Sequence, residues 1–410
     1  MNKPTTLFVC AAVSVRAVFA ALVPMSPEEG QTVELLSPGQ KDVLGQKTLE
    51  ERIAMTKDKS NRRVQGDKYW RKSLPFTLTF RATENEGGWG FWTVRIGKKA
   101  DLSDAHTWYL LQAKAHREIK TDCSPVATQS VVKIEVPRVN LEIATRYYWQ
   151  VARHVRVDEN GKKVFRDICA TPVSSFVTED LAPRWIAIEG RVGNMRDLGG
   201  RIGLDGRRVR QGMVYRGQGL NDNSTTGERK GRNRLTVEDV EYLTGTLGIR
   251  TDLDLRGQLE TADLAVSPLG KDVRFVLHPS YNYKGIFTAE GKKVMAENFR
   301  VFCDRDNYPI YFHCIAGADR TGSLAYVLNG VLGVSRHELE TDWESTFYPK
   351  IPDERPDPEY WCRESHFNNG FSKYGDAETP WNDRIVLYLK DCGITDAEIS
   401  EFRKIMLEDK

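Results

Sequence analysis

The sequence predicts a multidomain protein: a β-sandwich first, then an α/β domain whose largely parallel central sheet is flanked by helices. At 410 residues the chain is longer than one ordinary domain. Short apolar runs with turn-rich spacers lie at residues 76–80, 92–96 and 147–151, with no sustained helical period between them. Further on, an apolar run at 309–312 is followed by a loop and by helically spaced apolar residues at 321–332.

The first twenty residues resemble an export signal. A lysine precedes an apolar stretch at residues 7–15, and the small residues Val18 and Ala20 suit cleavage after Ala20. Arg16 interrupts the apolar stretch, so a cytoplasmic chain is the alternative. We expect a signal peptide at 1–20 and an exported protein, periplasmic or secreted. No later segment reaches the roughly 18 to 20 apolar residues of a spanning helix, so no integral membrane segment is expected in the mature chain.

The β-rich domain is expected to span residues 27–180. Its segment Thr-Arg-Tyr-Tyr-Trp-Gln-Val at 145–151 resembles a late strand of fibronectin type III modules, and the resemblance covers residues 75–178. Its aromatic residues are expected to fill the core rather than to bind carbohydrate. Cys123 and Cys169 are candidates for a disulfide bond, which the sequence alone does not establish.

The α/β domain is expected at residues 185–410, after a linker at 179–184. Helical spacing continues beyond the segment at 321–332, and a Thr-Asp-Ala-Glu capping box at 395–398 opens a last helix. Trp343 and Trp361 are expected in core packing, with the rim of a pocket as the alternative. The later helices are expected at residues 335–347, 381–389 and 395–407.

Ten residues, His-Cys-Ile-Ala-Gly-Ala-Asp-Arg-Thr-Gly from 313 to 322, join this predicted strand and helix. Cys314 and Arg320 are six residues apart, but the spacing alone means little because Cys10 and Arg16 repeat it. The strand, loop and helix matter more, since unpaired N–H groups and the positive dipole end at a helix start suit an anion. Phosphate is expected to contact Ile315, Ala316, Gly317, Ala318, Asp319 and Arg320.

Each polar group of the loop suits phosphate chemistry. The field at a helix start lowers a thiol pKa, so Cys314 is expected to be a nucleophilic thiolate. Arg320 offers a planar fork for two phosphate oxygens. Thr321 is expected to stabilise the sulfur as a leaving group, and His313 to orient the loop through the backbone. A buried, inert cysteine beside a solvated arginine is the alternative.

The loop resembles the active-site loop of the protein tyrosine phosphatase superfamily, in the bacterial branch that has HCxxGxDRTG. Three further motifs of that branch occur in order: Asn-Met-Arg-Asp-Leu-Gly-Gly at 194–200, Tyr-Arg at 215–216 and a Gly-Ile to Asp-Leu-Arg strand at 248–256. The resemblance covers about residues 185–408. It implies a metal-independent phosphate-monoester hydrolase with a phosphocysteine intermediate and no cofactor, and it favours a protein tyrosine phosphatase.

Two departures from the family pattern affect substrate and mechanism. Ala318 stands where relatives linked with phosphoinositides carry a lysine, and residues 278–283 lack the aspartate that many tyrosine phosphatases use as the general acid. The leaving oxygen still needs a proton unless its group is acidic. Asp319 is the first candidate for this acid, with a capping role as the alternative. Asp254, at a predicted strand end, is the second candidate, and His278 is the third.

The charge pattern leaves the substrate open. Net charge is +2, and residues 191–234 hold eleven Lys or Arg against four Asp or Glu. This stretch could steer a phosphorylated protein or a small phosphate ester, or it is a solvated loop. Its cluster of charges at 228–234 has no interleaved aromatic residues, so nucleic acid is not expected. Phosphotyrosine is favoured over an inositol polyphosphate or phosphoinositide. A catalytically weak phosphate-binding module is the alternative of another class, and arsenate reduction ranks lower.

Overall fold

The computed structural model describes residues 22–83, 91–110, 115–116, 129–223, 230–346 and 367–409. The predicted signal peptide at 1–20 and two residues singled out above, Cys123 and Trp361, lie outside these ranges. The chain forms two compact units. The first comprises Met1–Gln31, Thr77–Val136 and Tyr147–Phe176, and the second comprises Thr32–Phe76, Pro137–Arg146 and Val177–Lys410.

The two units do not divide at the predicted boundary near residue 180. Residues 32–76, predicted as part of the first domain, fold with the second unit as α1 (Pro38–Leu44), α2 (Leu49–Lys57) and α3 (Arg62–Gln65). Each helix starts after a polar residue whose side chain accepts a backbone N–H bond. These residues are Ser37 for α1, Thr48 for α2 and Asn61 for α3. Short capped helices give little apolar periodicity, so the sequence pattern indicated a helix only around residues 49–55.

The first unit is built on two sheets. One has the order β1 (Val23–Ser26), β3 (Thr77–Thr83), β7 (Gln129–Glu135) and β6 (Ala115–His116). The other runs β2 (Gln31–Val33), β10 (Ser174–Thr178), β8 (Arg146–Glu159), β4 (Phe91–Gly97) and β5 (His106–Leu110), with β9 (Lys162–Ala170) paired to β8. The three predicted strands lie in β3, β4 and β8. Phe80 of one sheet packs edge-to-face on Trp92 of the other, with ring centroids 4.8 Å apart.

The second unit has a five-stranded sheet that is largely parallel, as predicted. Its order is β11 (Arg196–Asp197), β12 (Val214–Gln218), β15 (Ile310–Cys314), β13 (Thr251–Asp254) and β14 (Arg274–Leu277). Four strands are parallel, and β11 runs antiparallel to β12. All five residues of the central strand β15 are buried, as expected for a parallel strand that is covered on both faces.

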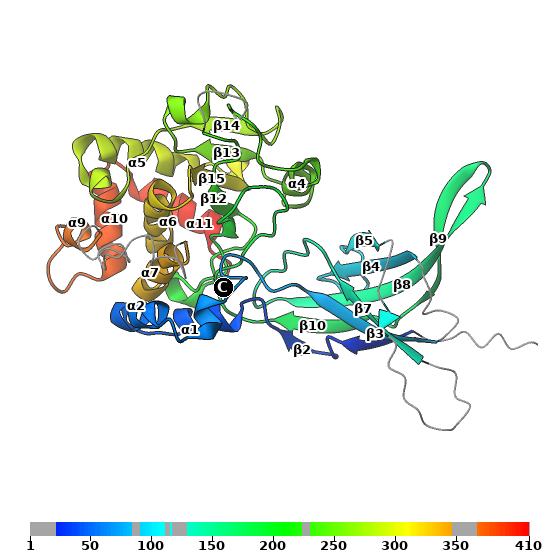
Figure 1. The fold of residues 1–410 in the computed structure, drawn as a ribbon. Helices are drawn as coiled ribbons and strands as arrows, with labels where there is room; N and C mark the ends of the chain where they lie inside the picture. The colour runs from blue at the N-terminus through cyan, green and yellow to red at the C-terminus, as the bar shows by residue number, and fades with distance from the viewer. Residues whose placement is uncertain are drawn as a thin grey trace, which may run out of the picture. The chain divides into compact units, whose positions relative to one another are not determined.

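Helices of the second unit cover both faces of this sheet (Figure 1). Ile310, Phe312 and Cys314 belong to one core and Tyr311 to the other, so side chains of β15 alternate between the faces. The predicted last helix begins with the expected capping box, in which Glu398 N donates to Thr395 at 3.2 Å. The main helices are α4 (Val237–Glu241), α5 (Ala289–Val301), α6 (Asp319–Val331), α7 (Arg336–Glu344), α9 (Asn369–Phe371), α10 (Trp381–Asp391) and α11 (Asp396–Met406).

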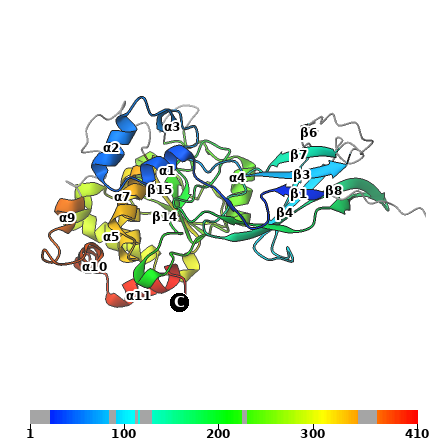
Figure 2. The same cartoon turned by 90° about the horizontal axis from the view of Figure 1, so that it is seen from below.

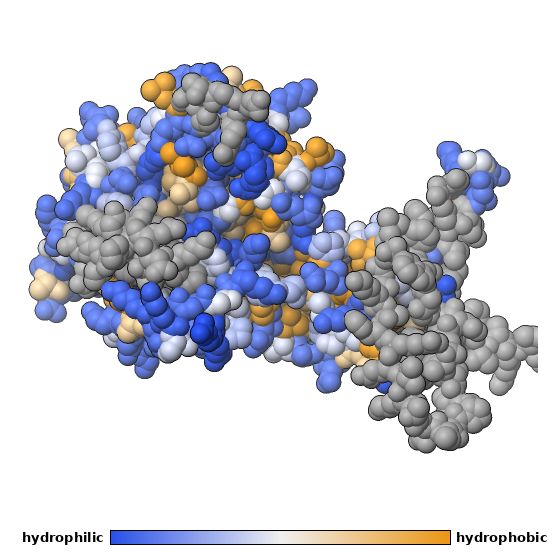
Figure 3. Space-filling model, viewed as in Figure 1, coloured by the Kyte–Doolittle hydropathy of each residue, from blue (hydrophilic) through white to orange (hydrophobic). Residues whose placement is uncertain are grey.

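The surface is mostly polar. Figure 3 shows a largely hydrophilic face on which apolar side chains are scattered, as is normal for a folded protein. Within the described ranges, no helix is long and apolar enough to cross a membrane.

Candidate active site

The loop predicted to hold phosphate lies at the carboxyl edge of the parallel sheet. Strand β15 ends at Cys314 and α6 begins at Asp319, so residues 315–318 make the turn between them. Neighbouring strands hold its base, because Leu255 N donates to His313 O at 2.8 Å and Gly219 N donates to Ile315 O at 3.2 Å. No side chain caps the start of α6, which leaves its first amides available to an anion.

Cys314 lies in an environment that favours the thiolate. Its side chain is 2% exposed, and this burial opposes ionisation. The nearby hydroxyl and N–H of Thr321, the charge of Arg320 and the N–H of Gly317 outweigh burial, so the pKa of the Cys314 thiol falls below its ordinary value. The predicted nucleophile and its predicted stabilising hydroxyl are therefore together.

Gly317 has the backbone conformation that the turn requires. Its φ of +67° lies in the left-handed region, and a Cβ there would come within 2.4 Å of the Gly217 carbonyl carbon. The carbonyls of the turn are bound from behind: Asn194 Nδ2 donates to Ala316 O at 3.2 Å and to Gly317 O at 3.0 Å, and Arg216 donates to Gly317 O at 2.8 Å. These bonds fix the peptide orientation of the turn.

Behind the turn, three buried arginines converge on one carboxylate. Asp342 of α7 accepts bonds from Arg216 at 2.6 Å, Arg201 at 2.9 Å and Arg196 at 3.0 Å. Burial opposes the charge of Asp342, but the three guanidinium groups hold the pKa of its carboxyl well below the ordinary range. We call these three arginines and Asp342 the rear cluster. Asp342 was not among the predicted residues, because it lies outside the motifs at 194–200 and 215–216.

Asp197 has a separate partner from its neighbour Arg196. Its carboxylate binds Arg184 at 2.8 Å and accepts the N–H groups of Gly199 and Gly212 at 2.8 and 2.7 Å. Asp197 thus fixes the glycine turn of the 194–200 motif, while Arg196 turns to the rear cluster.

Arg320 pairs with the carboxylate of Glu260, which was not among the predicted site residues either. Glu260, in the 3-10 turn η3 (Gln258–Thr261), accepts two parallel bonds from its guanidinium at 2.6 and 2.9 Å. The side chains are 20% and 34% exposed, so this pair can exchange with solvent anions. Burial lowers the pKa of Arg320, but the larger combined effect of Glu260 and Cys314 raises this pKa above its ordinary value. The guanidinium therefore stays charged. The sequence signal that could have indicated Glu260 is its place in the loop that follows the end of strand β13.

His313 and Asp254 form a buried group beneath the loop. His313 Nε2 lies 2.9 Å from Asp252 Oδ1, and Nδ1 lies 3.4 Å from the backbone oxygen of Cys314, so a carboxylate holds the ring in addition to the predicted backbone partner. Burial lowers the pKa of His313, but Asp254 and Asp252 raise it above the ordinary value. Asp254 is bound by Arg256 at 2.6 Å. Burial opposes its charge, yet His313 and Arg256 lower its pKa, which makes it a poor proton donor.

Asp319 and His278, the other candidate acids, lie on different elements. Asp319 is the first residue of α6, and its carboxylate accepts a hydrogen bond from the Tyr283 hydroxyl of η4 (Tyr283–Phe287). Tyr283 is itself held by Ser323, whose Oγ accepts the Tyr283 N–H at 3.1 Å. His278 follows β14, and its buried Nδ1 has no hydrogen-bond partner among the described residues.

Most cations of the basic stretch at 191–234 are already paired. Of its eleven Lys and Arg, Arg229 lies outside the described residues, and nine of the other ten lie within ion-pair distance of a carboxylate. The tenth, Arg232, is exposed. Most of the local positive charge therefore supports the fold.

Comparison with known proteins points to the same segment. Residues 187–356 match the model of the tyrosine phosphatase family. A protein of Cupriavidus necator, provisionally named a tyrosine-protein phosphatase, is 29% identical over an alignment of 200 residues, and the match covers 41% of this chain and 67% of that protein. The core catalytic domain of the S. cerevisiae PP-IP phosphatase SIW14, solved in complex with citrate, is 16% identical over 36% of this chain and 77% of that one. Its TM-score of 0.23 does not establish a shared fold.

The family match and the geometry agree. The matched residues include the whole loop from Cys314 to Arg320 and the motifs that bind it from behind. Residues 187–356 thus match a tyrosine phosphatase domain, and the chain is a cysteine-dependent phosphatase.

Proposed function

We propose that this protein is a protein tyrosine phosphatase that hydrolyses phosphotyrosine through a phosphocysteine. The observation that carries the proposal is the pairing of a low-pKa Cys314 with the uncapped start of α6 and the fork of Arg320. The nucleophile, the amides and the cation for phosphate all come from one turn.

In the first step, the Cys314 thiolate attacks phosphorus in line with the bond to the leaving oxygen. The S–P bond forms as the P–O bond breaks. Arg320 exchanges Glu260 for two phosphate oxygens, and loop amides bind the developing charge. The side chains supply the nucleophile and the charge stabilisation, so this step requires no metal.

A proton for the leaving oxygen comes from Asp319 in this mechanism. Asp319 stands at the first turn of α6 beside the phosphate loop, whereas Asp254 is committed to Arg256. In the second step, water attacks phosphorus and releases Cys314 as the thiolate, and Asp319 accepts the proton of that water. Asp319→Asn should therefore slow turnover of phenyl phosphates less than that of alkyl phosphates, because a phenoxide leaves more readily.

A substrate with a single phosphate suits this site better than a polyphosphate. The basic stretch was the feature that favoured an inositol polyphosphate, and nearly all its described cations have carboxylate partners. Ala318 also stands where a lysine would add charge to the loop.

The test is phosphate release by the full chain from a phosphotyrosine peptide and from inositol hexakisphosphate, with EDTA and reductant present, beside Cys314→Ser. We expect the wild type to release phosphate from the peptide and Cys314→Ser to release none. Preference for the inositol would replace the proposed substrate. Phosphate binding without release from either would favour a binding module.

We also propose that the first unit is a β-sandwich of the fibronectin type III kind and that the protein is exported. The two sheets with their Phe80 to Trp92 contact support the first statement, and the sequence of residues 1–20 supports the second. Mass spectrometry of the mature N-terminus would test export, with Ala21 as the expected first residue.

A further inference from the structure

Helix α7 carries carboxylates toward two different partners. Glu340 and Glu344 are four residues apart and therefore share one side of the helix. Both bind Arg52 of α2. Asp342 lies between them in sequence and binds the rear cluster. The helix thus stands between the N-terminal helices and the back of the phosphate loop.

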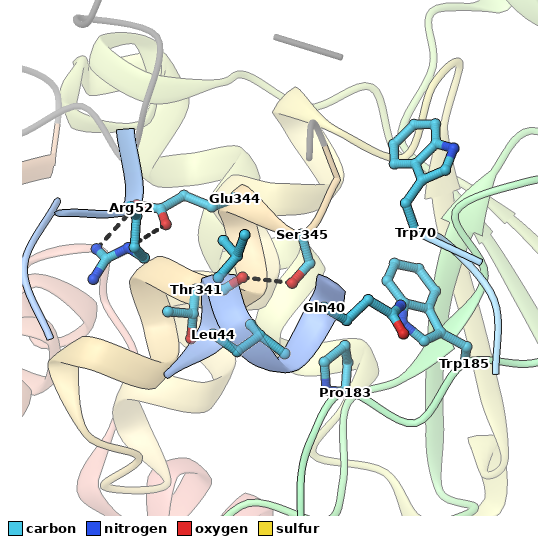
Figure 4. A pocket seen from close by; sticks show the side chains of 10 residues that line it. Gln40, Leu44, Arg52, Trp70, Pro183, Trp185, Thr341, Glu344 and Ser345 are labelled. Atoms are coloured by element: carbon cyan, nitrogen blue, oxygen red, sulfur yellow. Dashed lines mark hydrogen bonds and ion pairs between the residues drawn. The ribbon is translucent and has the colours of Figure 1, made fainter. Parts of the chain in front are cut away.

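The bond between α2 and α7 is fully buried. Arg52 is 0% exposed, and its Nε and Nη2 donate to the two carboxylate oxygens of Glu344 at 2.6 and 3.1 Å (Figure 4). Nη2 also donates to Glu340 at 3.2 Å. Both ribbon views place α2 beside α7 (Figures 1 and 2). A buried bidentate pair of this kind fixes direction as well as distance.

A second arginine of the same segment reaches the residue just beyond α7. The guanidinium of Arg71 donates to the backbone carbonyl of Thr346. The Thr346 hydroxyl accepts bonds from Asn194 Nδ2 and Arg196 Nη2, each at 3.2 Å. Because Asn194 also binds Gly317 O, one residue separates Thr346 from the phosphate loop.

Helix α7 also packs directly against α6, the helix that follows the phosphate loop. The buried ring of Trp343 lies against Gly322, where an added Cβ would come within 2.6 Å of Trp343 Cδ1. Trp343 is therefore a packing residue rather than part of a pocket rim. A shift of α7 would displace the first turn of α6 and the carbonyl anchors together.

We propose that Arg52 and Arg71, two arginines of the segment 38–76, position the phosphate loop through α7. Neither arginine touches the substrate; both are positioning residues. The segment lies between β2 and β3 in sequence, yet it completes the support of a loop some 250 residues later. The inference rests on the proposed role of Cys314 and its loop.

The test uses the full chain with Arg52→Lys, Arg52→Ala and Arg71→Ala. Arg63→Ala is the control, since Arg63 lies in the same segment but pairs with Asp42 at the surface. Two readouts apply below each variant's Tm: the pH profile of Cys314 alkylation by iodoacetate, and protection of that thiol by inorganic phosphate. Circular dichroism confirms that each variant is folded.

We expect Arg52→Ala and Arg71→Ala to move the alkylation profile to higher pH and to weaken phosphate protection. A loop displaced by a distant change can lose about 10- to 100-fold in kcat/KM. Arg52→Lys should recover part of this loss, and Arg63→Ala should match the wild type. A lowered Tm with unchanged alkylation and protection would overturn the inference, and Arg52→Lys and Arg71→Ala decide it if Arg52→Ala does not fold. Alkylation needs no turnover, so absence of phosphatase activity in the wild type would count against the proposed function alone.

Discussion

Arginines serve two different purposes on the two sides of the phosphate loop. On the open side, Arg320 is 20% exposed and pairs with one partly exposed carboxylate, Glu260. On the closed side, Arg196, Arg201 and Arg216 are at most 3% exposed and share the buried carboxylate of Asp342. Both sides use the same guanidinium fork, but only the open side can exchange its carboxylate for a phosphate.

The difference shows how burial divides binding from support. The partly exposed ion pair of Arg320 and Glu260 contributes little to stability, so Glu260 can give way when a doubly charged ligand binds Arg320. A buried pair cannot be broken without leaving an uncompensated charge. Burial and, after it, the nearby Arg196 lower the pKa of Arg216 to about 9, against the opposing effect of Asp342. The closed side is therefore stable only as a complete group.

The largest expected effect is on the open side. Arg320→Ala removes the fork that holds the equatorial oxygens, and kcat/KM should fall by about 10³-fold. Stability should change by about 1 kcal/mol or less, since the lost pair is partly exposed. Steady-state kinetics beside urea unfolding measures both, and Arg320→Lys should restore little because it lacks the planar fork. Activity near the wild-type level would contradict the assignment of Arg320.

The closed side should show the reverse balance. Arg216→Ala leaves Asp342 short of a partner and removes one of the two side-chain bonds to the carbonyl of Gly317, so we expect a loss of about 3 to 5 kcal/mol in the free energy of unfolding. Urea unfolding is the measurement. A loss below 1 kcal/mol, the limit expected for Arg320→Ala, would remove the distinction between the two sides.

A smaller change should affect the nucleophile between them. Thr321→Val keeps the side-chain volume but removes the hydroxyl that lowers the pKa of Cys314. The pKa of the thiol should rise, so the alkylation rate should reach its plateau at a higher pH than in the wild type. Below the pKa the sulfur is protonated and slow, and above it the thiolate reacts. Ser323→Ala is the matched control on α6, and an unchanged profile for Thr321→Val would rule out the hydroxyl as a cause.

The smallest expected effect comes from the exchangeable carboxylate. The Arg320 hydrogen bonds lower the pKa of Glu260 most, yet Glu260 remains partly exposed. Glu260→Gln should change the free energy of unfolding by less than about 1 kcal/mol. Thermal and urea unfolding of the variant beside Arg216→Ala tests this. A large loss would mean that the open pair is structural and does not yield to phosphate.

The local parts of the site could be predicted from the sequence because they are continuous in it. The apolar run at 309–312, the helical spacing after Thr321 and the need for Gly317 at a tight turn all act within a few residues. The prediction of a capping box at Thr395 was correct for the same reason. These features are set by the geometry of a strand, a turn and a helix.

The partners of these residues were decided only by the tertiary structure. Glu260 for Arg320, Asp252 for His313 and Asp342 for the rear arginines are brought together by strand order and helix packing. The sequence could not place residues 38–65 with the second unit, because their helices are short and their decisive contact is one arginine, Arg52, buried against α7. Sequence patterns record which face of an element is buried, whereas ion pairs between distant elements depend on how those elements meet.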